Sequence, residues 1–331
     1  MDAATAEGLL ALAEEVAPGL KGLDRQDTFA RLEERYDELL AALDWFVREE
    51  CADEAVRMAR ALTPFWQATR RLDVATDRLE RALALPGGDE ERRGRALVEA
   101  GFVWFLRGDD AAAAASYARA RALGVPTAAA LALTGLARIA LRDDDLDEAR
   151  RLAQEALGES GSDPVARGSA AHVLGVAAQM RGDFEEARGW LNERIALARA
   201  DGNYGILGLE SSNLAMVERQ LGDFDRAEEL SREALDNFHR RRDEWAYPFG
   251  LNGLAAVAVE RGELQRAATL IGAADAMVAA QGATWPPDEL PHYERIVAAL
   301  AAAPEPAELE RARAAGRALS PDDAVAFALR R

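Results

Sequence analysis

The 331-residue chain contains one cysteine, Cys51, and one lysine, Lys21. A single cysteine excludes an internal disulfide and is typical of a reducing compartment, so we expect a cytoplasmic protein. Aromatic residues make up only 6% of the chain, and alanine and leucine dominate its apolar residues, which favours helices over strands. The first residues lack the basic start of a secretory signal, and no apolar stretch reaches the roughly 18 residues of a membrane span.

Basic charge is also scarce relative to acidic charge. The 40 basic and 58 acidic residues give a formal net charge of −18. Nucleic-acid phosphates and anionic membrane surfaces repel such a chain. We therefore expect neither direct nucleic-acid contact nor membrane binding.

The residue patterns of catalytic and metal sites are missing as well. A phosphate-binding loop needs clustered glycines followed by lysine and a hydroxyl residue, but Lys21 is followed by Gly22. The three histidines, His172, His239 and His292, are too far apart in sequence to form a helical pair of zinc ligands. We expect no metal, no cofactor and no enzymatic activity.

The chain does contain a short phrase that recurs five times. It consists of a glycine or acid, an acid, usually an apolar residue, two variable residues and an alanine. The copies lie at residues 108–113, 144–149, 182–187, 222–227 and 262–267, with a degraded copy at 70–75. Their alanines are about 36 to 40 residues apart, which predicts a solenoid built from repeated units.

Each phrase is expected to join two antiparallel helices. The glycine can end the first helix in the left-handed conformation, and the acid can cap the positive start of the second helix. The small alanine allows the two helices to approach closely. The sequence therefore predicts an all-α fold of stacked helix pairs.

This reading divides one continuous solenoid into three parts. Residues 1–49 form an N-terminal helical cap of one or two helices, with a break at Pro18-Gly19. Residues 282–331 form a C-terminal helical cap, with a loop over 282–291 that contains Pro286 and Pro287, and helices at about 288–302, 305–317 and 320–330. Between the caps, residues 50–281 form six helix pairs, at 50–85, 86–123, 124–159, 160–200, 201–241 and 242–281.

A leucine followed by glycine or alanine stands eight and seven residues before the turn in most repeats. These pairs are Leu136-Ala137, Leu174-Gly175, Leu214-Ala215 and Leu254-Ala255. Together with the alanine after the turn, they resemble the tetratricopeptide (TPR) repeat, here in units longer than the usual length of about 34 residues. The resemblance implies a right-handed superhelix.

A narrower resemblance covers nearly the whole chain. It rests on residues 10–15, 31–33, 39–45, 78–83, 266–274 and 316–320. These segments are similar to the C-terminal array of actinobacterial LuxR-type and antibiotic-regulatory transcription regulators, in which a nucleotide-binding switch domain precedes the TPR array. The resemblance implies the sensing or partner-binding arm of a signal-transduction ATPase. The chain contains no ATPase or DNA-binding domain, and it resembles either a fragment or a stand-alone relative.

The TPR resemblance also implies that the first helix of each pair lines a concave groove. Its candidate residues are Arg95, Val98, Phe102, Thr134, Arg138, Arg142, His172, Val176, Met180, Ser212, Met216 and Asn252. Apolar anchors beside a few polar groups suit a peptide, a partner helix or a small effector. The alternative is that the apolar members fill the interior or pack on a cap.

Two functions follow from this reading. The leading hypothesis is a non-catalytic protein-interaction or ligand-sensing module that binds a peptide, a partner protein or a small effector in its groove and regulates transcription or a signal-transduction ATPase. The alternative is a structural scaffold that spaces domains or forms a homo-oligomer.

Overall fold

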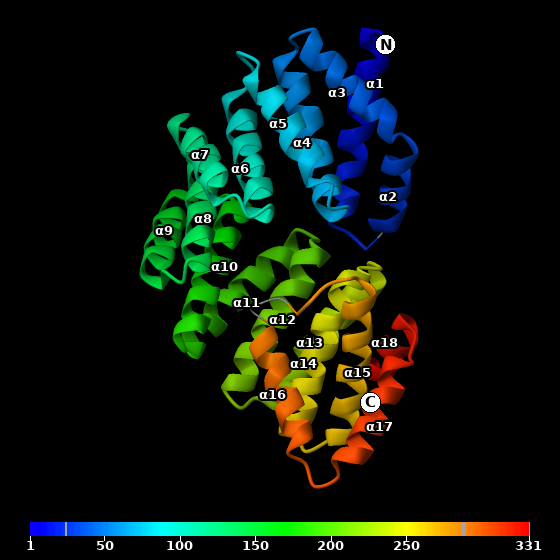
Figure 1. The fold of residues 1–331 in the computed structure, drawn as a ribbon. Helices are drawn as coiled ribbons and strands as arrows, with labels where there is room; N and C mark the ends of the chain where they lie inside the picture. Colours follow the sequence, from blue (N-terminus) through cyan, green and yellow to red (C-terminus); the bar gives the residue numbers. More distant parts are fainter. Residues whose placement is uncertain (24, 286–288, 331) are drawn as a thin grey trace. The chain divides into compact units, whose positions relative to one another are not determined.

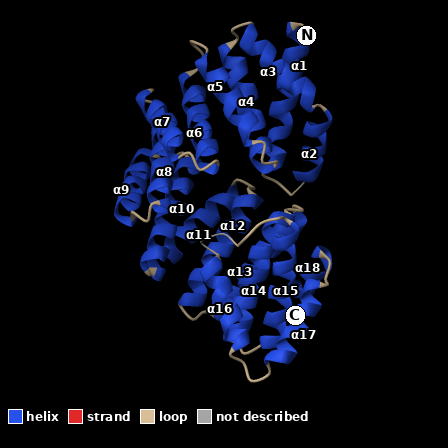
Figure 2. Cartoon of the chain, viewed as in Figure 1, coloured by secondary structure: helices blue, strands red, loops and turns tan. Residues whose placement is uncertain are grey.

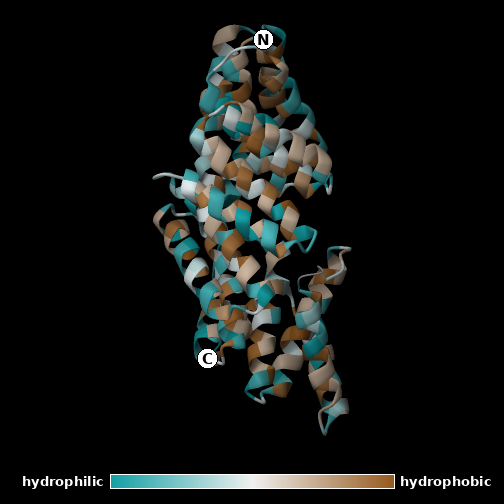
Figure 3. Ribbon diagram, turned by 90° about the vertical axis from the view of Figure 1, so that its left-hand side faces the viewer, coloured by the Kyte–Doolittle hydropathy of each residue, from teal (hydrophilic) through white to brown (hydrophobic). Residues whose placement is uncertain are grey.

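A computed structural model describes residues 1–23, 25–285 and 289–330. All regular structure in this part of the chain is helical, and it contains no strand (Figure 2). The predicted all-α class is confirmed. The helices carry both hydrophilic and hydrophobic residues, as expected for helices with one packed face (Figure 3). The chain divides into two compact units, Met1–Arg181 and Gly182–Arg331 (Figure 1).

The first unit contains the N-terminal helices and the pairs up to the fourth turn. Its elements are α1 (Ala3–Val16), η1 (Ala17–Leu20), α2 (Arg25–Glu34), α3 (Tyr36–Arg48), α4 (Ala52–Ala68), α5 (Leu72–Ala84), α6 (Glu90–Leu106), α7 (Asp110–Ala122), α8 (Pro126–Arg142), α9 (Leu146–Glu159) and α10 (Pro164–Arg181).

The N-terminal cap contains three α-helices in place of the one or two expected. The extra break lies at Arg35, whose backbone (φ −107°, ψ 12°) leaves the helical region between α2 and α3. No glycine or proline marks this position, so the break could not be predicted from the residues around it. Helix α1 packs on α3 and α4 and so covers the first helix pair.

The second unit contains the remaining pairs and the C-terminal helices. Its elements are α11 (Phe184–Ala200), α12 (Tyr204–Gln220), α13 (Phe224–Arg240), η2 (Glu244–Ala246), α14 (Tyr247–Glu260), α15 (Leu264–Ala280), α16 (Leu290–Ala301), α17 (Pro306–Arg317) and α18 (Pro321–Leu329). The last three helices lie within two residues of their expected bounds. Pro286 and Pro287, which the sequence places in a loop, lie outside the described residues.

The recurring phrase forms the turns as its residues predict. Gly108 and Gly222 adopt φ values of 82° and 83°, and Asp144, which replaces glycine in the second copy, adopts 60°. The following acids, Asp109 and Asp223, accept hydrogen bonds from backbone amides three residues later and so cap the next helix. The corresponding side chains of Asp183 and Glu263 form no capping hydrogen bond, so the prediction fails at these two turns. The turn and the helix start are therefore built by adjacent residues.

The helices of the first unit form two layers. The first helices α4, α6, α8 and α10 pack side by side in that order, and each second helix packs against the first helix of its own pair and of the next. The order brings the first helices of distant repeats onto one face. This inner face is the one that carries the candidate groove residues.

Tyr117 of α7 shows how closely the layers approach. Its ring is buried between Gly101 of α6 and Gly135 of α8. A Cβ atom at either glycine would overlap the ring. Burial also raises the pKa of the Tyr117 phenol to about 12, so the group stays neutral.

Glycine has a similar role in the second unit, where α15 crosses α17. A Cβ atom at Gly272 would overlap the carbonyl oxygen of Arg313, and one at Gly316 would overlap the carbonyl oxygen of Thr269. The two backbones can approach this closely only because both crossing positions lack a side chain.

Replacing Gly135 with alanine is expected to destabilise the protein by about 1–3 kcal/mol, because the added methyl group overpacks the Tyr117 ring. Urea unfolding followed by circular dichroism measures this change. The matched control is Gly8→Ala, at an exposed site in the middle of α1 with open space around it. The control should gain about 0.5–1 kcal/mol from helix propensity. Equal effects of the two substitutions would contradict the packing described for Tyr117.

Candidate functional site

A groove of about 630 Å³ lies on the inner face of the first unit. Its walls come from α4, α6 and α8, with Glu14 of α1 and Lys21 after η1 at one end. Four of the twelve candidate residues line it, namely Arg95, Val98, Phe102 and Arg138. Four of the nine candidate positions of this unit therefore lie together at one hollow.

An aromatic pair with two stacked arginines lies on this face. Phe102 stacks on Phe105 with ring centroids 6.1 Å apart, and the Arg138 guanidinium lies 5.4 Å from the centre of the Phe102 ring. Arg142 lies 3.5 Å from the centre of the Phe105 ring and forms an ion pair with Asp110 at 2.6 Å. Cation–π contacts of this kind hold the guanidinium groups against the rings.

The other groove arginines are held by carboxylates of neighbouring helices. Arg60 pairs with Glu99 at 3.0 Å, and burial raises the pKa of Glu99 although Arg60 opposes the shift. Arg95 pairs with Asp163 at 2.6 Å. Burial alone would raise the pKa of Asp163, but hydrogen bonds from the Ala166 amide and from Arg95 keep it below its usual range. These pairs connect α4 to α6 and α6 to the start of α10.

The remaining candidates of the first unit do not line this groove. Thr134 is fully buried, and its hydroxyl donates to the Ala130 carbonyl, so it presents no group to a ligand. His172 and Val176 are half-buried on α10, and Met180 is 48% exposed near the end of that helix. The expected position therefore identifies the helix face but not the exposure of each side chain.

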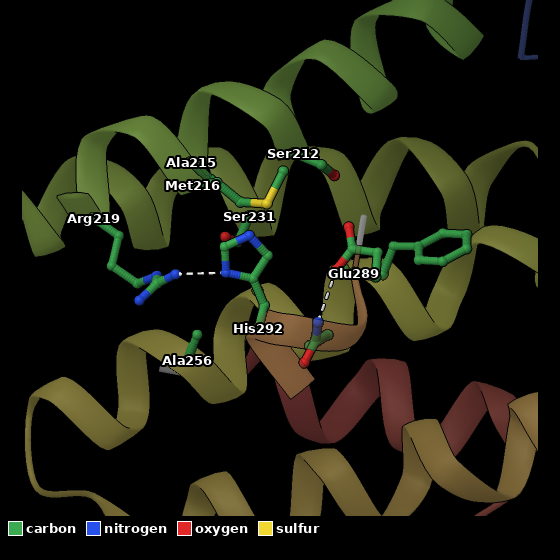
Figure 4. Close-up of a pocket in the computed structure, with 12 residues that line it drawn as sticks. Ser212, Ala215, Met216, Arg219, Ser231, Ala256, Glu289 and His292 are labelled. Atoms are coloured by element: carbon green, nitrogen blue, oxygen red, sulfur yellow. Dashed lines mark hydrogen bonds between the residues drawn. The ribbon is translucent and has the colours of Figure 1, made fainter. Parts of the chain in front are cut away.

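In the second unit, Ser212, Met216 and Asn252 surround a small cavity of about 20 Å³ (Figure 4). Helix α16 covers it. The Asn252 amide donates to Glu289 Oε2 at 2.8 Å, and His292 of α16 faces α12. The candidate residues of this unit therefore contact the chain's own C-terminal segment.

The sequence did not predict the contact that Arg219 makes across this cavity. Arg219 lies on α12, three residues after the candidate Met216, and its side chain is only 10% exposed. Its Nη2 atom lies 3.0 Å from His292 Nδ1 (Figure 4). No local pattern relates these two residues, which are 73 positions apart.

Burial lowers the pKa of His292 to about 4, and the charges of Arg219 and Arg295 add to the shift. The Arg295 guanidinium also lies 2.7 Å from Nδ1. Both guanidinium groups can only donate, so Nδ1 accepts and the imidazole is neutral.

The chemistry available elsewhere in the described residues is limited. They contain no group of three or more His, Cys, Asp or Glu side chains that could hold a metal ion. Burial, together with Glu54 and Glu49, raises the pKa of the half-buried Cys51 thiol, which disfavours the reactive thiolate. Within the same part of the chain, no helix combines the length and apolar character needed to cross a membrane.

Comparison with known proteins gives a family and a fold. A family model described as the MalT-like TPR region matches residues 129–303, more than half of the chain. No curated protein matches the sequence.

Two solved structures are similar in fold. The APC/C hetero-tetramer Cut9-Hcn1 gives a TM-score of 0.62 at 15% identity, over 82% of this chain and 48% of that chain. The signal transduction ATPase (STAND) protein PH0952 from Pyrococcus horikoshii, which has a tetratricopeptide repeat sensor, gives 0.51 at 17% identity, over 95% of this chain and 53% of that chain. The chain thus spans about half the length of these two chains, and the likeness shows a TPR-like α-solenoid fold.

Acidification is expected to destabilise the second unit as the pH falls from about 6.5 towards 4. In this range unfolded chains bind a proton at His292 while the folded protein does not, so protonation favours unfolding. An NMR titration of the His292 ring proton should show a midpoint near 4. His292→Gln should reduce the loss of stability on acidification. A His292 midpoint near 6.5 would contradict the buried, neutral imidazole.

Proposed function

Because the chain belongs to the family of MalT-like TPR regions, we propose that it is a non-catalytic protein-interaction module that binds a partner segment in the groove of the first unit. TPR folds typically mediate protein–protein interaction. The single observation that carries the proposal is the groove itself, in which Phe102 and Val98 provide apolar surface beside the guanidinium groups of Arg95 and Arg138.

This composition suits an extended or helical segment with an apolar anchor. Phe102 offers a ring face, and the arginines offer donors for carboxylate or backbone carbonyl groups. The groove volume also lies within the range of about 300–1,000 Å³ for small-molecule pockets, so a small effector is a second class of ligand.

We further propose that the module is the regulatory arm of a bacterial transcription regulator or signal-transduction ATPase and acts in the cytoplasm. The resemblance to LuxR-type and antibiotic-regulatory proteins supports this role. The fold it shares with a STAND protein that has a tetratricopeptide repeat sensor supports it too. In this role, occupation of the groove is the signal that the switch domain receives.

Substitutions in the groove are expected to weaken partner binding. Phe102→Ala removes the apolar anchor and Arg138→Ala removes the guanidinium stacked on it. Truncation of such central residues costs about 2 kcal/mol or more, roughly a 30-fold loss of affinity. Quantitative mass spectrometry of the proteins that the full chain enriches from its native cells identifies the partner. Binding measurements with the purified partner then give the change in affinity.

The matched control is Arg119→Ala, which removes an arginine of α7 that pairs with Glu80 away from the groove. It should retain wild-type binding. If folded Phe102→Ala and Arg138→Ala proteins bind every partner as well as wild type does, the groove is not the recognition surface. A defined homo-oligomer that no groove substitution alters would then favour the structural scaffold.

A further inference from the structure

The inner face of the second unit is covered by α16, a helix with a small buried surface. Only Ile296 and Leu300 of its twelve residues are buried, whereas α15 buries nine of its seventeen. Residues 283–285 before α16 and residues 302–305 after it form no helix. An element with so few buried apolar residues lies at the low end of local stability.

Polar contacts near its first turn hold α16 in place. Glu289 accepts a hydrogen bond from Asn252, and His292 accepts one from Arg219. Tyr293 accepts a hydrogen bond from Arg313 at 3.0 Å and stacks on Trp285 at 5.0 Å. The contacts to Arg313 and Trp285 do not involve the inner wall.

The wall beneath α16 is poorly matched to it. The Asn252 Oδ1 and Ser231 Oγ atoms are buried without a hydrogen-bond partner in the described structure. Both residues line the cavity of about 20 Å³. The Asn252 Oδ1 atom can only accept hydrogen bonds, and α16 donates none to it.

The electrostatic match at Arg219 is poor as well. This guanidinium is largely buried, its carboxylate partner Glu260 lies 3.6 Å away, and it faces the neutral ring of His292. Burial and the nearby positive charge of Arg295 lower the pKa of Arg219, in keeping with a cation that is weakly compensated. A carboxylate in the place of the imidazole would form a charge-assisted hydrogen bond.

We propose that the inner wall formed by α12 and α14 is a second recognition surface, for an amphipathic helix of a partner protein, and that α16 occupies it until that helix displaces it. The partner helix carries apolar residues four positions apart, as Ile296 and Leu300 are in α16, and an acidic residue in its first turn that pairs with Arg219. This surface is separate from the groove of the first unit, so the inference does not rest on the function proposed for that groove.

A labelled peptide of residues 289–301 that carries His292→Glu tests the proposal by fluorescence anisotropy with the full chain. Tyr293→Ala in the protein removes the contacts of α16 to Arg313 and Trp285 but leaves the wall intact. It should strengthen peptide binding at least about tenfold, because the competing helix is released more often. Added to the Tyr293→Ala protein, in which α16 is already released, Arg219→Ala should weaken binding of the same peptide at least about tenfold.

Two controls accompany the measurement. A peptide with the natural His292 should bind more weakly than the His292→Glu peptide, and Phe102→Ala in the protein should leave binding unchanged. Hydrogen exchange in the wild-type chain should show faster exchange in α16 and slower exchange in α12 and α14 when the peptide is added. The proposal is overturned if the folded Tyr293→Ala protein does not bind the peptide, or if the added Arg219→Ala leaves binding unchanged.

Discussion

Close approach between successive helices is the constraint on which the rest of the structure depends. No helix pair can bury its own apolar face, so each must be covered by its neighbours. The helices of each pair approach closely at the alanine of the repeat phrase. These five alanines are all fully buried, namely Ala113, Ala149, Ala187, Ala227 and Ala267. A larger side chain at these positions would separate the helices and displace the first helices whose exposed faces form the inner wall.

The two units use their inner walls differently. In the first unit, Phe102 and Arg138 line a groove that remains open. In the second unit, the corresponding face of α12 and α14 contacts α16 of the same chain. The glycine crossing of α15 and α17 accounts for part of this difference, since it fixes the helix that follows α16 firmly to the last pair. A tightly held α17 keeps α16 close to the wall even though α16 itself buries little surface.

The features that could be predicted from the sequence are those that neighbouring residues determine. The left-handed conformation of Gly108 and the capping by Asp109 follow from adjacent residues, and so the turns and helix pairs could be placed in advance. The contact between Arg219 and His292 could not, because it joins two elements far apart in the chain. The burial of Thr134 could not be predicted either. Its position in the repeat predicts which face of the helix it occupies, but its burial depends on how neighbouring helices pack around it.

The charges of the first-unit groove determine how it can bind. Arg60 and Arg95 already pair with Glu99 and Asp163, so a ligand that takes either guanidinium must compete with an existing carboxylate. Exchanging one partly buried ion pair for another gains little free energy. The surface of Phe102 carries no such cost, because covering it removes apolar area from water. Affinity in this groove therefore comes mainly from the apolar anchor, while the arginines select among ligands by charge and direction.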